Sequence, residues 1–404
     1  MTQKGLLGST EGWSLEPVAS WLFGEGRRVN DPVKLIEGLA RQLDLAGARI
    51  DRLAFVCRTL HPQFIGWNVR WTRQKGAQRA SVEHAVRATD AFIGSPVEYV
   101  QQHQRPYRLR VTPRAEEGEP SLLPDLRHDG ITDYAALPMP FGREMTNVLT
   151  AATADPGGFT DADLERLATL ARLVSPFVEI IAVRRTTLGL LDTFVGPRIS
   201  ERIFQGQVKR GDGDRIEAAF WYSDLRGFTA LSDRLPAETV VDILNQYFDC
   251  QVNAIRQRGG EVLKYMGDGL LAVFPIDEYV GDAQQVCGRV LEAAHESRVS
   301  VAELQYPIGD AVEQFRFGVA LHVGRILYGN IGGGNRLDFT CIGPAVNLAA
   351  RLEKIASNLR RTVVASEGFA GICRGGGSDL GEFPVAGFAK AARVYGLVDE
   401  TPLS

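Results

Sequence analysis

Two aspartates stand where apolar runs of this sequence give way to glycine-containing turns. Asp224 follows an apolar run and precedes Leu225-Arg-Gly-Phe-Thr229. A carboxylate at a strand end can hold a cation, while the amides of such a loop face a polyphosphate. Asp268 lies in Met266-Gly-Asp-Gly269, at the predicted tip of a hairpin over 261–275. Each also has an ordinary interpretation, because aspartate is common after strands and Gly-Asp-Gly is a common hairpin turn.

Further polar side chains give these aspartates partners. Lys264 precedes Asp268 by four residues on the same hairpin, so the period of a strand places it on the same face. Asn347 and Arg351 are four residues apart at the start of a predicted helix and therefore share one helix face. Asp338 lies shortly before that helix. The chemistry thus depends on blocks that are far apart in the sequence.

The elements that must position these blocks follow Glu217, where strand-like and helix-like patterns alternate. This order predicts an α+β sandwich with four or five strands. The expected elements are a strand over 218–223, a helix over 237–258, the hairpin, a helix over 280–304, a strand over 315–323 and a helix over 345–355.

The first 160 residues mix short strand patterns with turn clusters. Residues 134–140 and 147–152 are predicted to be strands, and residues 31–45 and 81–86 to be helical. The stretch 113–129, rich in Pro, Glu and Gly, is predicted to be a loop.

A long helix is predicted between these parts. Thr160-Asp-Ala-Asp163 has the pattern of a capping box. Spacings of three and four residues then favour a two-stranded parallel coiled coil, and the alternative is an amphipathic helix packed on its own domain. Pro176 favours a kink, and Gly196-Pro197 ends the pattern. The predicted seam is Leu167, Leu170, Val174, Phe177, Ile181, Arg184, Leu188, Leu191 and Val195.

Composition sets limits on the class of protein. The 404 residues carry a formal net charge of only -4, which gives no sign of a nucleic-acid or membrane partner. The five cysteines form no C-x-x-C pair, so reduced thiols are expected rather than disulfides or a structural zinc site. No secretory signal and no run near ~18 apolar residues is present, which predicts a cytoplasmic protein.

Four blocks in order resemble class III nucleotidyl cyclase domains: 220–229, 261–269, Asp338 and 341–351. The resemblance covers 216–404. It implies a ferredoxin-like core and a head-to-tail homodimer with active sites at the subunit interface. It also implies conversion of ATP to 3′,5′-cyclic AMP and pyrophosphate.

The same resemblance implies roles for individual residues. Asp224 and Asp268, with the backbone carbonyl of Leu225, would bind two Mg²⁺ or Mn²⁺ ions. From the other subunit, Asn347 would orient the ribose and Arg351 would stabilise charge on the α-phosphate. The phosphates would be contacted by Gly227, Phe228, Thr229 and, as in some family members only, Arg325.

Hydrogen-bonding chemistry then bears on which purine is bound. Adenine offers N1 as an acceptor and N6 as a donor, which Lys264 and ionised Asp338 complement. Guanine reverses both groups, and guanylyl members resemble Glu and Cys at these places. ATP is therefore expected. The alternatives are a structural salt bridge between the two residues and a guanylyl or dual-specificity cyclase.

Two positions depart from the family pattern. Pro344 stands where an acidic residue is usual, and Ala386 stands where a phosphate-binding lysine is common, with Lys390 nearby. Both bear on triphosphate affinity. A catalytically silent, nucleotide-binding regulatory dimer is a further alternative, against which the intact Asp224 and Arg351 argue.

The first half of the chain resembles, more weakly, a GAF-type sensory domain, mainly over 134–152 and 156–160. Its ligand is expected to be an unidentified small molecule, or none. The resulting domain prediction is a GAF-like sensory domain over 1–160, a signalling helix over 161–197, a connector over 198–215 and a cyclase domain over 216–404.

Overall fold

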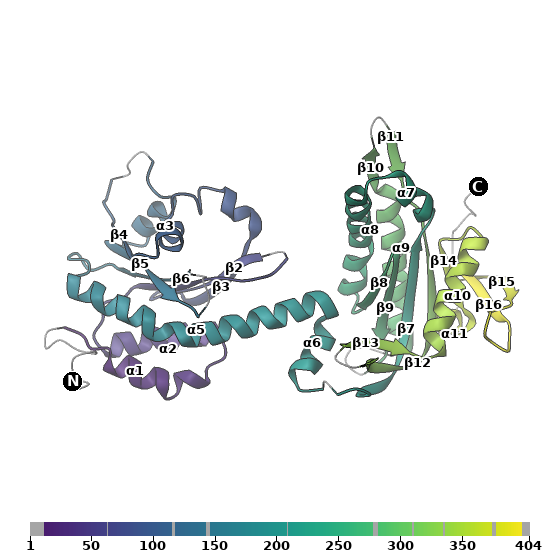
Figure 1. Cartoon of the computed structure of the whole chain (residues 1–404), viewed down its shortest axis with the longest axis horizontal. Coiled ribbons are helices and arrows are strands. Elements are labelled where there is room, and N and C mark those ends of the chain that lie inside the picture. The colour runs from purple at the N-terminus through teal and green to yellow at the C-terminus, as the bar shows by residue number, and fades with distance from the viewer. Residues whose placement is uncertain are drawn as a thin grey trace. The chain divides into compact units, whose positions relative to one another are not determined.

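The computed structural model describes residues 12–62, 64–114, 118–142, 146–207, 209–277, 282–308, 311–333, 336–373 and 377–397. The chain forms two compact units, Met1–Thr193 and Phe194–Ser404, which we call unit 1 and unit 2. Each is drawn in Figure 1 and is described by itself.

Unit 1 is built on a six-stranded antiparallel sheet with the order β3-β2-β1-β6-β5-β4. The predicted strands 134–140 and 147–152 are confirmed as β5 and β6. The strands are β1 (Arg52–Arg58), β2 (Phe64–Thr72), β3 (Gly76–Glu83), β4 (Tyr107–Arg110), β5 (Asp133–Pro140) and β6 (Thr146–Thr153).

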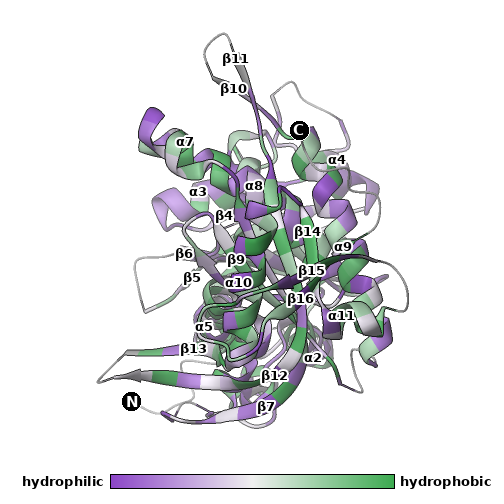
Figure 2. Cartoon of the chain, turned by 90° about the vertical axis from the view of Figure 1, so that its right-hand side faces the viewer, coloured by the Kyte–Doolittle hydropathy of each residue, from purple (hydrophilic) through white to green (hydrophobic). Residues whose placement is uncertain are grey.

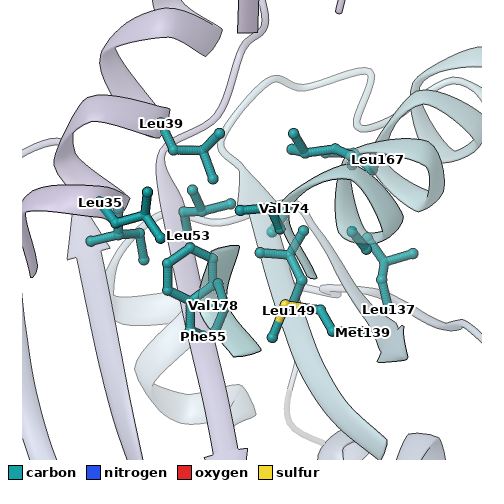
Figure 3. Close-up of a cluster of buried hydrophobic side chains, with 14 of the residues drawn as sticks. Leu35, Leu39, Leu53, Phe55, Leu137, Met139, Leu149, Leu167, Val174 and Val178 are labelled. Carbon is teal, nitrogen blue, oxygen red and sulfur yellow. The ribbon is translucent and has the colours of Figure 1, made fainter. Parts of the chain in front are cut away.

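Helices cover both faces of this sheet. Apolar residues of β1, β5 and β6 that point to one face pack against α1, α2 and α5, and Figure 3 shows Leu35 and Leu39 of α2 opposite Leu167 and Val174 of α5. The opposite face packs against α3 and α4. The helices are α1 (Glu16–Phe23), α2 (Pro32–Leu45), α3 (Pro96–His103), α4 (Leu123–His128) and α5 (Asp161–Val195), with 3₁₀ turns Gly26–Arg28 and His84–Ala88.

Two sequence predictions in unit 1 were wrong in part. Residues 81–86 are not an α-helix: β3 extends through Glu83 and pairs with β2, and a 3₁₀ turn follows. The predicted loop 113–129 contains α4, because Leu123 and Leu126 have a core to pack into. Tertiary packing decided both segments.

The capping box at the start of α5 is confirmed. Asp163 Oδ2 accepts from the backbone N–H of Thr160 at 3.0 Å, and Thr160 Oγ1 accepts from the N–H of Asp163 at 3.2 Å. The first half of the predicted seam packs on unit 1 and not on a second copy of the helix. Leu167, Leu170 and Val174 are buried in the core of unit 1, as an amphipathic helix packed on its own domain requires.

Unit 2 is built on an eight-stranded sheet. Its order is β15-β16-β14-β12-β7-β9-β8, with β13 paired to β12. The strands are β7 (Gly213–Leu225), β8 (Glu261–Met266), β9 (Gly269–Pro275), β12 (Phe317–Gly333), β13 (Arg336–Ile342), β14 (Val363–Ser366), β15 (Gly377–Phe383) and β16 (Ala392–Leu397). A separate hairpin of β10 (Gln305–Ile308) and β11 (Ala311–Gln314) projects from the unit in Figures 1 and 2.

The core of unit 2 has the predicted ferredoxin-like arrangement. Its chain order is β7-α8-β8-β9-α9-β12, and the sheet order β12-β7-β9-β8 interleaves the two halves of this βαββαβ unit. The helices are α6 (Pro197–Phe204), α7 (Phe228–Arg234), α8 (Ala237–Gln257), α9 (Ala283–Glu303), α10 (Pro344–Asn358) and α11 (Glu367–Ile372).

The two faces of this sheet have separate cores. Trp221 of β7 and Phe274 of β9 pack under α8 and α9, while Phe220 of β7 packs on the other face, where Ala349 of α10 and Ile199 of α6 also lie. Figure 1 shows α8 and α9 on one side of β7 and α10 on the other. The segment 198–215, expected to be a polar connector, thus includes a helix anchored on unit 2.

Candidate active site

The two aspartates that the sequence singles out lie together. Asp224 is in register with Gly269 across β7 and β9, and Asp268 occupies the β8–β9 turn after Gly267, whose φ is +67°. The pKa of Asp224 is raised to about 7, first by partial burial and then by the charge of Asp268, to which it hydrogen bonds. The pair is therefore a site of concentrated negative charge that a cation would relieve.

A buried ion pair that the sequence analysis missed stands beside these carboxylates. Arg226 Nη1 lies 2.5 Å from Glu353 Oε1, and the Glu353 side chain is only 6% exposed. Arg226 lowers the pKa of Asp224, whereas Glu353 raises it. The one sequence signal for this contact is Gly318, where a Cβ atom would stand 1.7 Å from Arg226 Nη2. The pair links the loop after β7 to α10 and so fixes where that loop lies.

The side chains expected to select the purine also meet. Lys264 Nζ of β8 lies 2.7 Å from Asp338 Oδ2 of β13, and their side chains are 49% and 58% exposed. The two strands are not neighbours in the sheet, so only the fold places these residues together. At such exposure the ion pair itself adds little stability. Both groups remain accessible to a ligand.

Asn347 and Arg351 occupy the exposed face of α10. Within the described residues, neither side chain makes a hydrogen bond or ion pair. Arg325 is also exposed, and its Nε atom lies 3.6 Å from Glu217 Oε2. It borders a surface pocket whose lining includes Gly343 and Pro344.

The loop after Asp224 has the conformation that a phosphate-facing turn needs. Gly227 has a φ of +75°, a left-handed conformation that suits glycine, and α7 begins at the next residue. Phe228 and Thr229 form the first turn of that short helix. Their free backbone amides are available, since the first N–H groups of a helix have no partner within it.

Asp224 and Asp268 are the candidate ligands for a divalent metal at this site. In the part of the chain that the structure describes, no three or more His, Cys, Asp or Glu side chains are arranged to hold an ion. Asp224 and Asp268 are thus two carboxylates without a third. Mg²⁺ is usually held by one or two carboxylates together with substrate phosphates, so this set fits an ion that binds with its nucleotide.

Comparison with known families identifies the class of unit 2. Residues 214–369 match the family described as the adenylate and guanylate cyclase catalytic domain. Unit 2 therefore contains a class III adenylyl/guanylyl cyclase catalytic domain, as its sequence blocks predict.

Curated relatives agree with this assignment. The terminal-differentiation-specific adenylate cyclase of Dictyostelium discoideum is 23% identical over 263 residues, 62% of this chain and 11% of that protein. Adenylate cyclase 1 of Rhizobium meliloti is 28% identical over 179 residues, 44% of this chain and 26% of that protein. The matched stretch thus spans only a small part of these relatives.

Among solved structures, a bacterial light-regulated adenylyl cyclase is 26% identical, with a TM-score of 0.40 over 46% of this chain and 91% of that one. The guanylyl cyclase Cya2 is also 26% identical, with a TM-score of 0.40 over 46% and 93%. No helix in the described ranges combines the length and apolarity that crossing a membrane requires.

Proposed function

We propose that the chain is an adenylyl cyclase that converts ATP to 3′,5′-cyclic AMP and pyrophosphate. The observation that carries the choice of ATP is the contact between Lys264 Nζ and Asp338 Oδ2 at 2.7 Å. Together the two groups offer a donor and an acceptor, which adenine N1 and N6 complement. With guanine, Lys264 would face the N1–H donor and Asp338 the O6 acceptor.

In the proposed reaction the ribose 3′-hydroxyl loses its proton to water and its oxygen attacks the α-phosphorus, the bond to the bridging oxygen breaks, and pyrophosphate leaves. Asp224 and Asp268, with the Leu225 carbonyl, would hold the Mg²⁺ or Mn²⁺ ions. When bound, these ions would lower the pKa of the 3′-hydroxyl and place positive charge at the triphosphate. The amides of the Gly227–Thr229 turn bind phosphate oxygens, and Arg325 assists at the triphosphate.

Each active site is proposed to form between two copies of the chain. Asn347 and Arg351 are exposed on α10 and bind none of the described side chains, as expected of residues that serve a partner's nucleotide. Asn347 orients the ribose, and Arg351 neutralises charge that develops on the α-phosphate. Loss of such a donor costs about 10²–10³ in rate.

The decisive assay gives the purified chain Mn²⁺ with ATP or GTP and measures cyclic nucleotide and pyrophosphate. We expect turnover of ATP and its loss in Asp224→Ala. Asp233→Ala, at an exposed aspartate of α7, is the matched control and should stay active. Preferred turnover of GTP would establish a guanylyl cyclase instead. A folded dimer with no turnover would favour a silent nucleotide-binding dimer.

We further propose that unit 1 is a GAF-like sensory domain that regulates unit 2 through α5 and α6. The first half of the predicted seam is buried in unit 1. Two copies of α5 would therefore have to pair through other apolar residues, which are exposed on α5. Ile180, Val183 and Phe194 are 65%, 58% and 78% exposed, and they fit spacings of three and four residues.

The regulatory proposal is tested by removing unit 1. Deleting residues 1–160 would also expose Leu167 and Val174, so a chain that begins at Phe194 is the cleaner comparison. We expect changed basal turnover and weaker dimerisation, with the activity still dependent on dimers. Equal turnover and equal oligomeric state in both chains would contradict the coupling.

A further inference from the structure

Unit 1 contains a surface pocket of about 180 Å³ that the proposed cyclase reaction does not use. It lies beside β1 and β2, close to the end of α4 and the residue that follows β6. Its charged lining residues are four cations and two anions: Arg52, Arg70, Arg73, Lys75, Asp51 and Asp129.

The register of the sheet places two of these arginines together. Arg52 pairs with Thr72 and Ala54 pairs with Arg70, so Arg52 and Arg70 are diagonal neighbours on one face. Arg52 is only 9% exposed. Burial lowers its pKa, and the charge of Arg70 lowers that pKa further. The strands therefore hold two like charges against each other at the pocket wall.

The acidic residues of the pocket compensate these charges only in part. Asp51 is already used, because its Oδ1 accepts from Arg73 Nε at 3.1 Å and its Oδ2 accepts from the N–H of Ala154 at 2.8 Å. Asp129 forms an ion pair with Arg52 at 3.6 Å, too long for a hydrogen bond, and its charge offsets only part of the lowering of the Arg52 pKa. Arg52 has no hydrogen bond from its guanidinium to the described residues, and Arg70 has no ion pair with them.

We propose that this pocket binds a small molecule through a phosphate group held between Arg52 and Arg70. Guanidinium groups bind phosphate oxygens in pairs of parallel hydrogen bonds, and a dianion compensates both positive charges at once. Lys75, which also lines the pocket, adds positive potential that attracts such a ligand, whereas Arg73 is paired with Asp44 and Asp51. The proposal goes beyond the cyclase function, because the pocket lies in unit 1 and has no role in the proposed reaction. Binding to it can be measured without turnover.

The test is calorimetric titration of the full-length chain with inorganic phosphate, without divalent metal and at constant ionic strength. Arg52→Met and Arg70→Met keep an unbranched apolar stem and remove one charge each. Arg79→Met is the matched control: Arg79 is exposed on β3 opposite Val69, whose side chain belongs to the other face of the sheet. A parallel titration with succinate provides a carboxylate probe.

We expect the wild-type chain and Arg79→Met to bind one phosphate per chain in this pocket. Arg52→Met and Arg70→Met should each weaken that binding by about tenfold or more. Because Arg70 is exposed, its variant should unfold at the wild-type temperature, and loss of binding would not reflect loss of fold. Phosphate binding that is equal in all four chains would overturn the proposal. Succinate binding that is tighter than phosphate and lost in both variants would also overturn it, in favour of a carboxylate ligand.

Discussion

At the scale of single residues, the candidate active site of unit 2 contains charged side chains that lie close to one another. Asp224 and Asp268 repel, and the pKa of Asp224 rises to about 7 as a result of burial and of that repulsion. Lys264 and Asp338 attract, and each leaves hydrogen-bonding capacity for a ligand. Such arrangements are typical of sites that await a bound partner.

The raised pKa of Asp224 predicts a pH-dependent affinity for metal. Because a carboxylate must lose its proton to bind a cation, protons compete below the pKa of about 7. We expect Mn²⁺ affinity, measured by electron paramagnetic resonance, to fall by up to about tenfold per pH unit below that pKa and to level off above it. Asp268→Asn should lower the pKa of Asp224, since it removes the neighbouring charge. An affinity that is constant across about pH 6 to 8 would contradict the assignment.

If Lys264 and Asp338 select the purine, as proposed, replacing both residues should change the substrate preference. Lys264→Glu combined with Asp338→Cys replaces the donor with an acceptor and the acceptor with a weak donor. We expect the ratio of kcat/KM for ATP to that for GTP to fall by at least about tenfold. Lys34→Glu, an exposed charge reversal in unit 1, serves as control. An unchanged ratio in the double variant would mean that Lys264 and Asp338 form only a structural salt bridge.

At the scale of elements, α6 contacts the strands that carry Lys264 and Asp338. The Arg202 guanidinium lies 5.7 Å from the ring centres of both Tyr328 and Phe339, and Phe339 directly follows Asp338. Glu261, at the start of the strand that carries Lys264, accepts a hydrogen bond from the backbone of Arg198, and burial raises its pKa. A displacement of α6 would therefore reach both strands of the pair.

We accordingly expect Arg202→Met to act on substrate binding rather than on the chemical step. Loss of the cation above Phe339 should loosen β13, raise KM for ATP several-fold and weaken the preference over GTP, while kcat changes less. The control is Arg210→Met, at an exposed arginine of the same segment. A fall in kcat alone, with KM and preference unchanged, would contradict this positioning role.

At the scale of the whole molecule, the candidate site residues form two groups on different elements of unit 2. Asp224 lies near the end of β7, and Asp268 lies in the turn between β8 and β9. Asn347 and Arg351 lie on the exposed face of α10. Two copies of the chain would complete each group with the other.

This division predicts complementation between inactive variants. Asp224→Ala and Arg351→Ala should each be inactive as homodimers. Mixed in equal amounts and allowed to exchange, they should recover about a quarter of wild-type turnover, because half of the dimers then contain one intact site of two. Mixing each variant with itself is the control. Without recovery despite confirmed subunit exchange, the shared-site proposal would fail.

The sequence by itself determined the local parts of this protein. The capping box at Thr160, the β8–β9 hairpin around Asp268 and the family of unit 2 all follow from short blocks, because turns, caps and motifs depend on adjacent residues. Periodicity also predicted α5, but it could not choose the buried face. Both Leu167 and Ile180 belong to apolar stripes, and only the sheet of unit 1 decides that the first is buried.

Only the tertiary structure decided the contacts between distant segments. Arg226 and Glu353 are 127 residues apart, and their buried pair depends on how α10 packs across the sheet. Lys264 and Asp338 meet from strands that are not neighbours. Arg52 and Arg70 become neighbours through strand register, which is set by the burial of one whole face. The residue types limit the chemistry that is available. Packing between distant segments decides which charged side chains come into contact.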